Sequence, residues 1–312
     1  TVLLDKMAEE NQTEQVTELT LVGLTENPQL QGPLFVLFLL IYFITLAGNS
    51  GMVALIRSSS QLQSPMYFFL SNLSLLDACY SSVVAPRTLM DLLMEKKTIS
   101  LAGCTAQLFF FIAFGTTKCF LLAAMAYDRY VAICNPLLYP AIMSHRVCTL
   151  LVAGSSVLGL LHSSVHTDFT FSLSFCWPAK VNHFYCDLMT VLVLSCSDTH
   201  VNKCLIFGLA GLVEMVTILA VLVSYAFILS VVSKISSAKG RRKAFSTCTS
   251  HLAGVTIFHG SILALSFQPR SSDTLCTDKI FAVFYSLVVP MLDLLIYSLR
   301  NREVKNALRE FV

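Results

Sequence analysis

Long apolar stretches separated by short polar segments run along almost the whole chain. Seven of them approach or exceed the roughly 20 mostly apolar residues with which a helix crosses a bilayer. They cover about 33–56, 66–90, 101–132, 147–165, 205–232, 245–267 and 280–299. The fourth stretch is rich in Gly and Ser and the sixth in Ser, Thr and His, so these two assignments rest on length and spacing. The pattern predicts an all-α membrane protein built as a seven-helix transmembrane bundle.

The composition supports a bilayer as the solvent of this chain. Hydrophobic residues make up 55% of it, charged residues 13%, and the mean hydropathy is +0.70. A soluble domain carries about 25% charged residues, so too few polar side chains are present here to cover a water-facing surface. This excludes a disordered chain, a mini-protein held only by disulfides and most cytosolic enzymes. The net charge of +2 is too small to indicate a nucleic-acid partner.

The distribution of Lys and Arg predicts the orientation of the bundle, because basic residues are enriched in cytoplasmic loops. With the N-terminus outside, 12 of the 21 basic residues are cytoplasmic, and the densest group lies at 234–243. Asn11 begins the glycosylation sequon Asn-Gln-Thr, which requires a lumenal tail. No cleavable signal peptide is apparent, so we expect the first span to act as the signal.

These boundaries predict three segments. Residues 1–29 form an extracellular N-terminal tail, 30–300 the seven-helix transmembrane domain, and 301–312 a cytoplasmic amphipathic helix. In the last segment, apolar residues such as Val304 alternate at helical spacing with basic residues such as Lys305. We expect this helix to lie on the inner surface of the membrane.

The chain contains 11 cysteines. Cys104, Cys176, Cys186 and Cys196 fall outside the membrane or at its outer rim, where an oxidising environment permits disulfides. Two bridges are expected, and the sequence alone allows three pairings. Zinc binding together with the nearby His183 is the alternative, which we disfavour because the cysteine spacing fits no compact metal loop. The sequence therefore predicts neither a metal site nor a cofactor.

Several long motifs stand at defined places in the seven spans. They are PMYFFL (65–70) at the start of the second, MAYDRYVAIC (125–134) at the end of the third, SY (224–225) in the fifth, KAFSTC (243–248) at the start of the sixth, and PML (290–292) and IYSLRN (296–301) near the end of the seventh. With seven spans and a Cys at the head of the third, the chain resembles a rhodopsin-like G-protein-coupled receptor. The motifs together resemble those of the odorant receptors of the tetrapod-type class, over about 21–308.

The resemblance implies a receptor that binds a small-molecule odorant and activates a heterotrimeric G protein of the stimulatory, olfactory type, which raises cAMP. Its expected location is the plasma membrane of olfactory cilia, as a multi-pass protein with an extracellular N-terminus. Family members join the third-helix Cys to the middle loop Cys, which implies a bridge between Cys104 and Cys186. A second bridge would join Cys176 and Cys196 and hold the loop as a lid over the ligand pocket.

The resemblance also implies where the G protein is contacted, at the inner ends of the spans. Asp128 is expected to hold Arg129 in the resting state, and the freed guanidinium then meets the G protein on activation. Tyr225 and Tyr297 are expected to turn inward and stabilise the open state. The coupling residues are Asp128, Arg129, Tyr130, Tyr225, Lys239, Arg241, Arg242, Lys243 and Tyr297.

The ligand pocket is expected in the outer half of the bundle, with a mainly apolar lining and a few hydroxyls. Its lining residues are Phe111, Ile112, Gly115, Thr116, Cys119, Ile206, Leu209, Ala210, Val213, His259, Ile262, Leu263, Ser266, Val283 and Ser286. Phe111 stands where aminergic receptors carry Asp, so no partner for an ammonium ligand is available there. His259 stands where the family commonly has Tyr, and it is either a packed polar residue or a hydrogen-bond partner of the ligand. The expected ligand is small, neutral and mainly hydrophobic.

The ionisable residues inside the spans depart from the family pattern. Asn49 and Asp77 match it, whereas Lys118 stands where Glu is typical and Asp293 where Asn is typical. Lys118 lies about 16 Å along its helix from Arg129, which places it at mid-depth. Buried charges in a membrane are normally paired. Many rhodopsin-like receptors hold a sodium ion in this region, so we expect the Lys118 ammonium to take the place of that cation and to pair with Asp77, Asp293 or both.

Two other functions fit parts of the pattern. A receptor for a non-volatile internal ligand outside the nose would share this fold, and tissue expression would distinguish it. A transporter is disfavoured by the odd number of spans and by the absence of an internal sequence repeat. An enzyme is not expected, because the chain has no Ser/His/Asp set, HExxH motif or phosphate-binding Gly loop.

Overall fold

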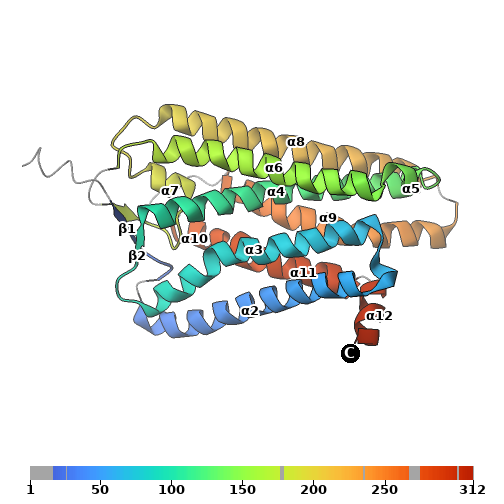
Figure 1. Cartoon of the computed structure of the whole chain (residues 1–312), viewed down its shortest axis with the longest axis horizontal. Coiled ribbons are helices and arrows are strands. Elements are labelled where there is room, and N and C mark those ends of the chain that lie inside the picture. Colours follow the sequence, from blue (N-terminus) through green and yellow to red (C-terminus); the bar gives the residue numbers. More distant parts are fainter. Residues whose placement is uncertain are drawn as a thin grey trace, which may run out of the picture.

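The structure is a computed structural model that describes residues 17–25, 27–175, 179–234, 236–266, 275–300 and 302–311. Within these residues, 7 helices are long and apolar enough to cross a membrane, and they lie side by side in one bundle (Figure 1). The seventh runs through α10, a short π-helical stretch η3, and α11. The bounds are α2 (Pro28–Ser58), α3 (Pro65–Leu93), α4 (Leu101–Cys134), α6 (His145–Phe171), α8 (His200–Val232), α9 (Ala238–Ser266), α10 (Leu275–Val283), η3 (Phe284–Val288) and α11 (Val289–Arg300).

All seven predicted spans are confirmed, and most of the helices extend beyond the apolar stretch that predicted them. Side-chain caps define the starts of two of them, α2 and α4. At the start of α2 the Asn27 side chain accepts a hydrogen bond from the Gln29 backbone N–H, and Pro28 fills the first position. Ser100 caps α4 in the same way, through the Gly103 N–H. These polar caps satisfy backbone groups that no earlier turn can reach.

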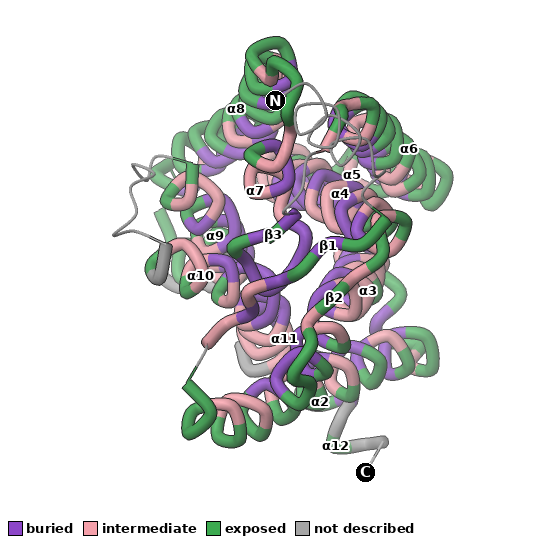
Figure 2. Tube along the Cα trace, turned by 90° about the vertical axis from the view of Figure 1, so that its left-hand side faces the viewer, coloured by how far each residue is buried: buried purple, intermediate pink, exposed green. Residues whose placement is uncertain are grey.

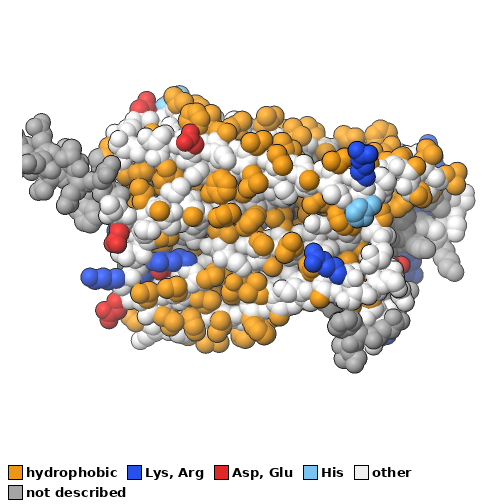
Figure 3. Space-filling view, viewed as in Figure 1, with side chains coloured by type: hydrophobic (Ala, Val, Ile, Leu, Met, Phe, Trp, Pro, Cys, Tyr) orange, Lys and Arg blue, Asp and Glu red, His pale blue; other side chains and the backbone are white. Residues whose placement is uncertain are grey.

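The helices place apolar side chains outward and charged side chains inward. Phe43 on α2 is 67% exposed, whereas Lys118 on α4 is 1% exposed. Figure 3 shows hydrophobic side chains covering most of the visible length of the bundle, with charges gathered towards its ends. Lipid tails solvate such a surface, while charges at mid-depth must be satisfied inside the protein.

Helix α4 is the centre of the bundle and packs against α3, α6, α8 and α9. It comes very close to α6 at Gly159. A Cβ atom at this position would lie 2.6 Å from the Ala113 carbonyl oxygen and would also meet the Thr117 hydroxyl. Small residues at such crossings let two membrane helices come into direct backbone contact.

Gly159→Ala is therefore expected to destabilise the receptor, because the Ala113 carbonyl belongs to the backbone and cannot turn aside. Overpacking of this kind typically costs about 1–3 kcal/mol. Gly154→Ala on the same helix is the control, since a Cβ there meets nothing within 4 Å. Thermal unfolding of the purified receptor should show a lower Tm for the first variant only. An unchanged Tm for Gly159→Ala would contradict the close contact.

One end of the bundle, here called the lid end, is covered by a small sheet that the sequence did not predict. It consists of strands β1 (Glu18–Leu21), β2 (Thr98–Ser100) and β3 (Lys180–Val181), in the order β2-β1-β3. The central strand β1 is antiparallel to β2 and parallel to β3. Figure 2 looks onto this end and shows the strands lying across the helices, beside the short helix α7 (Leu188–Leu192).

The opposite end, here called the α12 end, carries the turn η1 (Ser60–Leu62) and the short helices α5 (Tyr139–Ile142) and α12 (Arg302–Phe311). Helix α12 turns away from the bundle axis (Figure 1) and confirms the predicted C-terminal helix. The Tyr67 hydroxyl donates to Glu303 Oε2 over 2.6 Å, and Val304 is buried while Lys305 is exposed. The helix is thus amphipathic, as the sequence predicted, and is tied to α3.

Candidate functional site

Three charged side chains meet in the middle of the bundle. Lys118 Nζ on α4 lies 2.5 Å from Asp77 Oδ1 on α3 and 2.7 Å from Asp293 Oδ2 on α11. All three residues are buried, and the ammonium also lies 4.8 Å from the centre of the Phe258 ring. The expected pairing of Lys118 is present, and it involves both carboxylates. One ammonium therefore ties three helices together at mid-depth.

Asn49, the fourth member of the predicted polar cluster, stands beside these charges rather than among them. Its amide donates to the Thr45 carbonyl oxygen over 2.9 Å and to the Pro290 carbonyl oxygen over 3.5 Å. It thereby joins α2 to the start of α11. Gly254 on α9 packs on the other side of Asp293, where a Cβ would lie 3.1 Å from Oδ1. The charge cluster is thus enclosed by helices on several sides.

Aromatic side chains lie between the charge cluster and the lid. The Phe111 ring stacks on Tyr80 at 4.9 Å and lies 5.1 Å from Tyr185 and 5.7 Å from Tyr285. The Tyr185 and Tyr285 hydroxyls are hydrogen-bonded to each other, and burial raises the pKa of Tyr185 well above its usual value. Tyr185 belongs to the loop before α8, so the lid reaches into the predicted pocket. Sequence reasoning missed it, although its neighbour Cys186 fixes its place.

The predicted pocket residues differ in where their side chains lie. Thr116 is engaged with His162 on α6 over 2.9 Å, and Ala210 and Ser266 are exposed. The other predicted lining residues are buried or partly buried, namely Phe111, Ile112, Gly115, Cys119, Ile206, Leu209, Val213, His259, Ile262, Leu263, Val283 and Ser286. Contact with a ligand stays a prediction for all of them.

His259 already has a protein partner. Its Nδ1 lies 2.8 Å from Glu214 Oε1 on α8, and both side chains are buried. The sequence placed Glu214 inside the fifth span without assigning it a role. The pair is a further buried contact of ionisable groups at mid-depth, and it joins α8 to α9.

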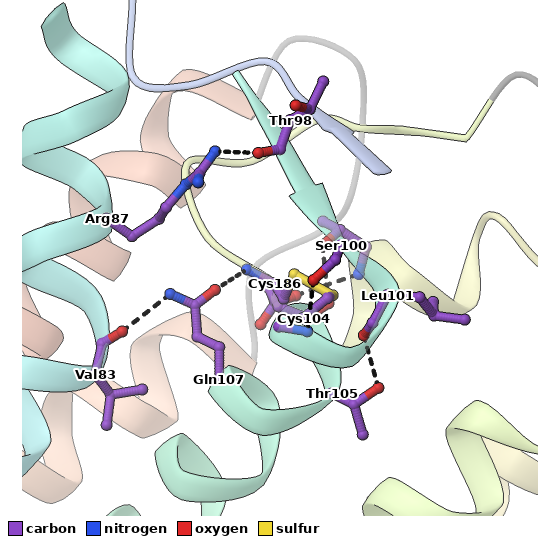
Figure 4. Close-up of a disulfide and its surroundings, with 12 residues drawn as sticks. Val83, Arg87, Thr98, Ser100, Leu101, Cys104, Thr105, Gln107 and Cys186 are labelled. Atoms are coloured by element: carbon purple, nitrogen blue, oxygen red, sulfur yellow. Dashed lines mark hydrogen bonds between the residues drawn. A yellow bond between two sulfur atoms is a disulfide. The ribbon is translucent and has the colours of Figure 1, made fainter. Parts of the chain in front are cut away.

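The lid is anchored by the disulfide between Cys104 and Cys186, whose Cα atoms are 5.5 Å apart. Figure 4 shows Gln107 beside it, with its amide donating to the Val83 carbonyl oxygen and its side-chain oxygen accepting from the Cys186 N–H, each over 3.0 Å. Cys196 is also disulfide-bonded. Its expected partner Cys176 lies outside the described residues, as does Asn11.

At the α12 end, the described residues show no ion pair between Asp128 and Arg129, which corrects the expected resting contact. Asp128 Oδ1 instead accepts a hydrogen bond from the Tyr139 hydroxyl on α5 over 2.8 Å. Arg129 is buried, and within the described part of the chain its Nε has no hydrogen-bond partner.

The other predicted coupling residues differ in their surroundings. The Tyr225 hydroxyl lies 2.8 Å from His251 Nδ1, and His251 Nε2 lies 3.1 Å from the Leu122 carbonyl oxygen. This chain links α8, α9 and α4, and no sequence signal indicated that His251 takes part. Tyr130 packs against Phe227. Tyr297 is buried, Arg241 and Arg242 are exposed, and the side chains of Lys239 and Lys243 lie outside the described part.

Known proteins are similar to this chain in both sequence and fold. The olfactory receptor family profile matches residues 38–312. Olfactory receptor 5T17 of Mus musculus is 51% identical over 307 residues, which cover 98% of this chain and 95% of the relative. Olfactory receptor 5B21 of Homo sapiens is 54% identical over 299 residues, 96% of each chain.

Squid rhodopsin shares the fold, with a TM-score of 0.74 and 19% identity over 91% of this chain and 85% of the rhodopsin. The relatives are receptors and not enzymes. The seven membrane-spanning helices found here agree with that class of protein. The chain therefore belongs to the olfactory receptor family, within the rhodopsin-like G-protein-coupled receptors, and is a multi-pass membrane protein.

Proposed function

We propose that the receptor binds a small, neutral, mainly hydrophobic odorant between the lid and the charge cluster. This proposal rests on the observation that the charged side chains at mid-depth are already paired with one another. Lys118 is held by Asp77 and Asp293, and Glu214 by His259. A charged ligand would have to displace one of these contacts, whereas a neutral one loses little by leaving water for an apolar, aromatic lining.

The proposed response is activation of a stimulatory, olfactory-type G protein at the α12 end, which raises cAMP. In this arrangement the lid end and the tail over 1–29 face outside, the bundle over 30–300 spans the plasma membrane of olfactory cilia, and 301–312 lies on the inner surface. The Tyr225–His251–Leu122 chain supports a switch at this end, because it holds α8, α9 and α4 together beside Arg129.

A panel of odorants tests the ligand class. Neutral alcohols, aldehydes, ketones and esters are compared with carboxylic acids and amines of the same chain length, in cells that express the receptor and the olfactory G protein. We expect cAMP to rise with neutral members only. A response confined to the ionised members would contradict the proposal.

Arg129→Ala should then abolish the cAMP response to the odorant found, while leaving odorant binding largely intact. Arg129 is buried at the end where the G protein is expected, about 27 Å along α4 from Phe111 in the predicted pocket. Arg57→Ala, an exposed basic residue at the same end, is the matched control and should keep the response. An equal loss of odorant binding in Arg129→Ala would mark Arg129 as a structural residue instead.

A further inference from the structure

Three metal-ligating side chains from three helices converge beside the charge cluster. They are Cys119 on α4, Glu214 on α8 and His259 on α9, and their ligand atoms all lie within 4.8 Å of one another. Cys119 Sγ is 3.8 Å from Glu214 Oε2, and His259 Nδ1 is 2.8 Å from Glu214 Oε1. Cys119 and His259 are buried, and the Glu214 side chain is 11% exposed.

We propose that Cys119, Glu214 and His259 form a zinc-binding site. Thiolate, imidazole and carboxylate are the ligand types that Zn²⁺ takes, at about 2.0–2.3 Å and in tetrahedral geometry. Two ligands of a tetrahedral zinc ion are therefore roughly 3.3–3.7 Å apart. The separation of Cys119 and Glu214 is close to this value. To admit the ion, the His259–Glu214 contact has to open by about half an ångström, and Cys119 and His259, whose ligand atoms lie within 4.8 Å, have to reach the same range.

The His259 ring has the freedom for this movement. Its Nε2 is buried and has no hydrogen-bond partner among the residues that the structure describes. The ring is therefore held through Nδ1, and no hydrogen bond on its other nitrogen resists a small shift.

The charges also allow a divalent ion at mid-depth. The Cys119 thiolate and the Glu214 carboxylate together balance Zn²⁺, so the loaded site is neutral. A neutral loaded site adds no net charge to the low-dielectric interior. The nearby Lys118 ammonium is paired with two carboxylates, those of Asp77 and Asp293.

Three protein ligands leave the fourth position of a tetrahedral ion open. The ion would also fasten α8 and α9 to α4 at the depth of the charge cluster. Because zinc would bind the folded receptor and not the unfolded chain, the receptor becomes more stable as the zinc concentration rises above Kd. Cys119 and His259 also belong to the predicted pocket lining, so the test measures zinc binding directly and does not use the odorant response.

The test uses the full-length receptor, purified in lipid nanodiscs and stripped with a chelator. All samples carry Cys204→Ser, because Cys204 is exposed and lies 3.8 Å from His200 Nδ1, a pair that could bind zinc on the surface. We expect one Zn²⁺ per receptor and a Tm that rises with zinc. With Co²⁺ as the probe, we expect a sulfur-to-cobalt charge-transfer band, which reports a thiolate ligand.

Added singly, Cys119→Ser, Glu214→Gln and His259→Tyr should each weaken zinc binding at least tenfold. His259→Tyr restores the residue common in the family and so guards against a general folding defect. Cys134→Ser, at a free cysteine elsewhere on α4, should bind zinc normally. The proposal is wrong if the Cys204→Ser receptor takes up no zinc and gives no charge-transfer band, or if the three variants bind zinc as tightly as their parent.

Discussion

Changing Lys118 to Glu is expected to abolish folded receptor at the cell surface. The ammonium lies 2.5 Å from Asp77 and 2.7 Å from Asp293. With Glu in its place, three carboxylates would lie together in the interior, and none of them would have a positively charged partner there. Breaking a buried ion pair by removing one partner typically costs about 3–5 kcal/mol, a large part of the roughly 5–15 kcal/mol that keeps a protein folded. Surface labelling by flow cytometry measures the loss.

A second substitution separates charge balance from general damage. Asp293→Asn restores the family residue and removes one carboxylate, so adding it to Lys118→Glu should recover part of the surface expression. Lys96→Glu makes the same chemical change at an exposed position near the lid end and should express normally. Normal expression of Lys118→Glu alone would show that the buried contact does not hold the fold.

The same contact predicts that signalling does not depend on sodium. A tethered ammonium already sits between the two carboxylates, so a free cation would have to compete with it for the same oxygens. Basal and odorant-driven cAMP should therefore match when sodium is replaced by choline at constant ionic strength. A change seen in the wild type, and lost in Asp77→Asn, would indicate that a sodium ion competes with Lys118.

The seven helices and the pairing of Lys118 could be predicted because each follows from one dominant cost. Unpaired backbone groups are very unfavourable in lipid, so an apolar stretch of sufficient length must be a helix. A charge at mid-depth must likewise find a partner, and Asp77 and Asp293 are acidic residues at matching depth. The π-helical stretch η3 did not follow from the sequence, because its apolar residues suit an α-helix equally well.

Contacts that depend on helix rotation could not be predicted. Glu214 and His259 lie on helices whose relative rotation is fixed by packing along their whole length, and no local pattern records it. The Asp128–Tyr139 bond is a similar case. The family resemblance pairs Asp128 with Arg129, whereas here a tyrosine from the next short helix donates to Asp128.

The lid sheet could not be predicted for a different reason. β1 has 4 residues and β3 has 2, which is too short for an alternating apolar pattern to stand out. The strands are held by long-range contacts, since Leu19, Leu21 and Val181 pack with the disulfide in one small core. The sequence identified the four cysteines that organise this region, and the family resemblance selected the pairing of Cys104 with Cys186.

Removing the Cys104–Cys186 disulfide is expected to have an effect as large as breaking the Lys118 contact. The bridge joins residues 82 positions apart, and closing a loop of this length stabilises a fold by about 4–5 kcal/mol in the chain-entropy account. It also fixes Tyr185, the residue before Cys186, against Tyr285 and Phe111. Cys104→Ser should therefore lower surface expression severely and abolish the odorant response of any receptor that remains.

The double variant Cys104→Ser/Cys186→Ser distinguishes loss of the bridge from the effect of an unpaired thiol. If the bridge itself matters, the double variant is as defective as either single one, because all three lack the same covalent link. Cys79→Ser, at a free cysteine on α3, should express and respond normally. Peptide mapping without reduction gives the direct check: the two cysteines should appear in one linked peptide pair, and finding either as a free thiol in the folded receptor would contradict a lid held by this bridge.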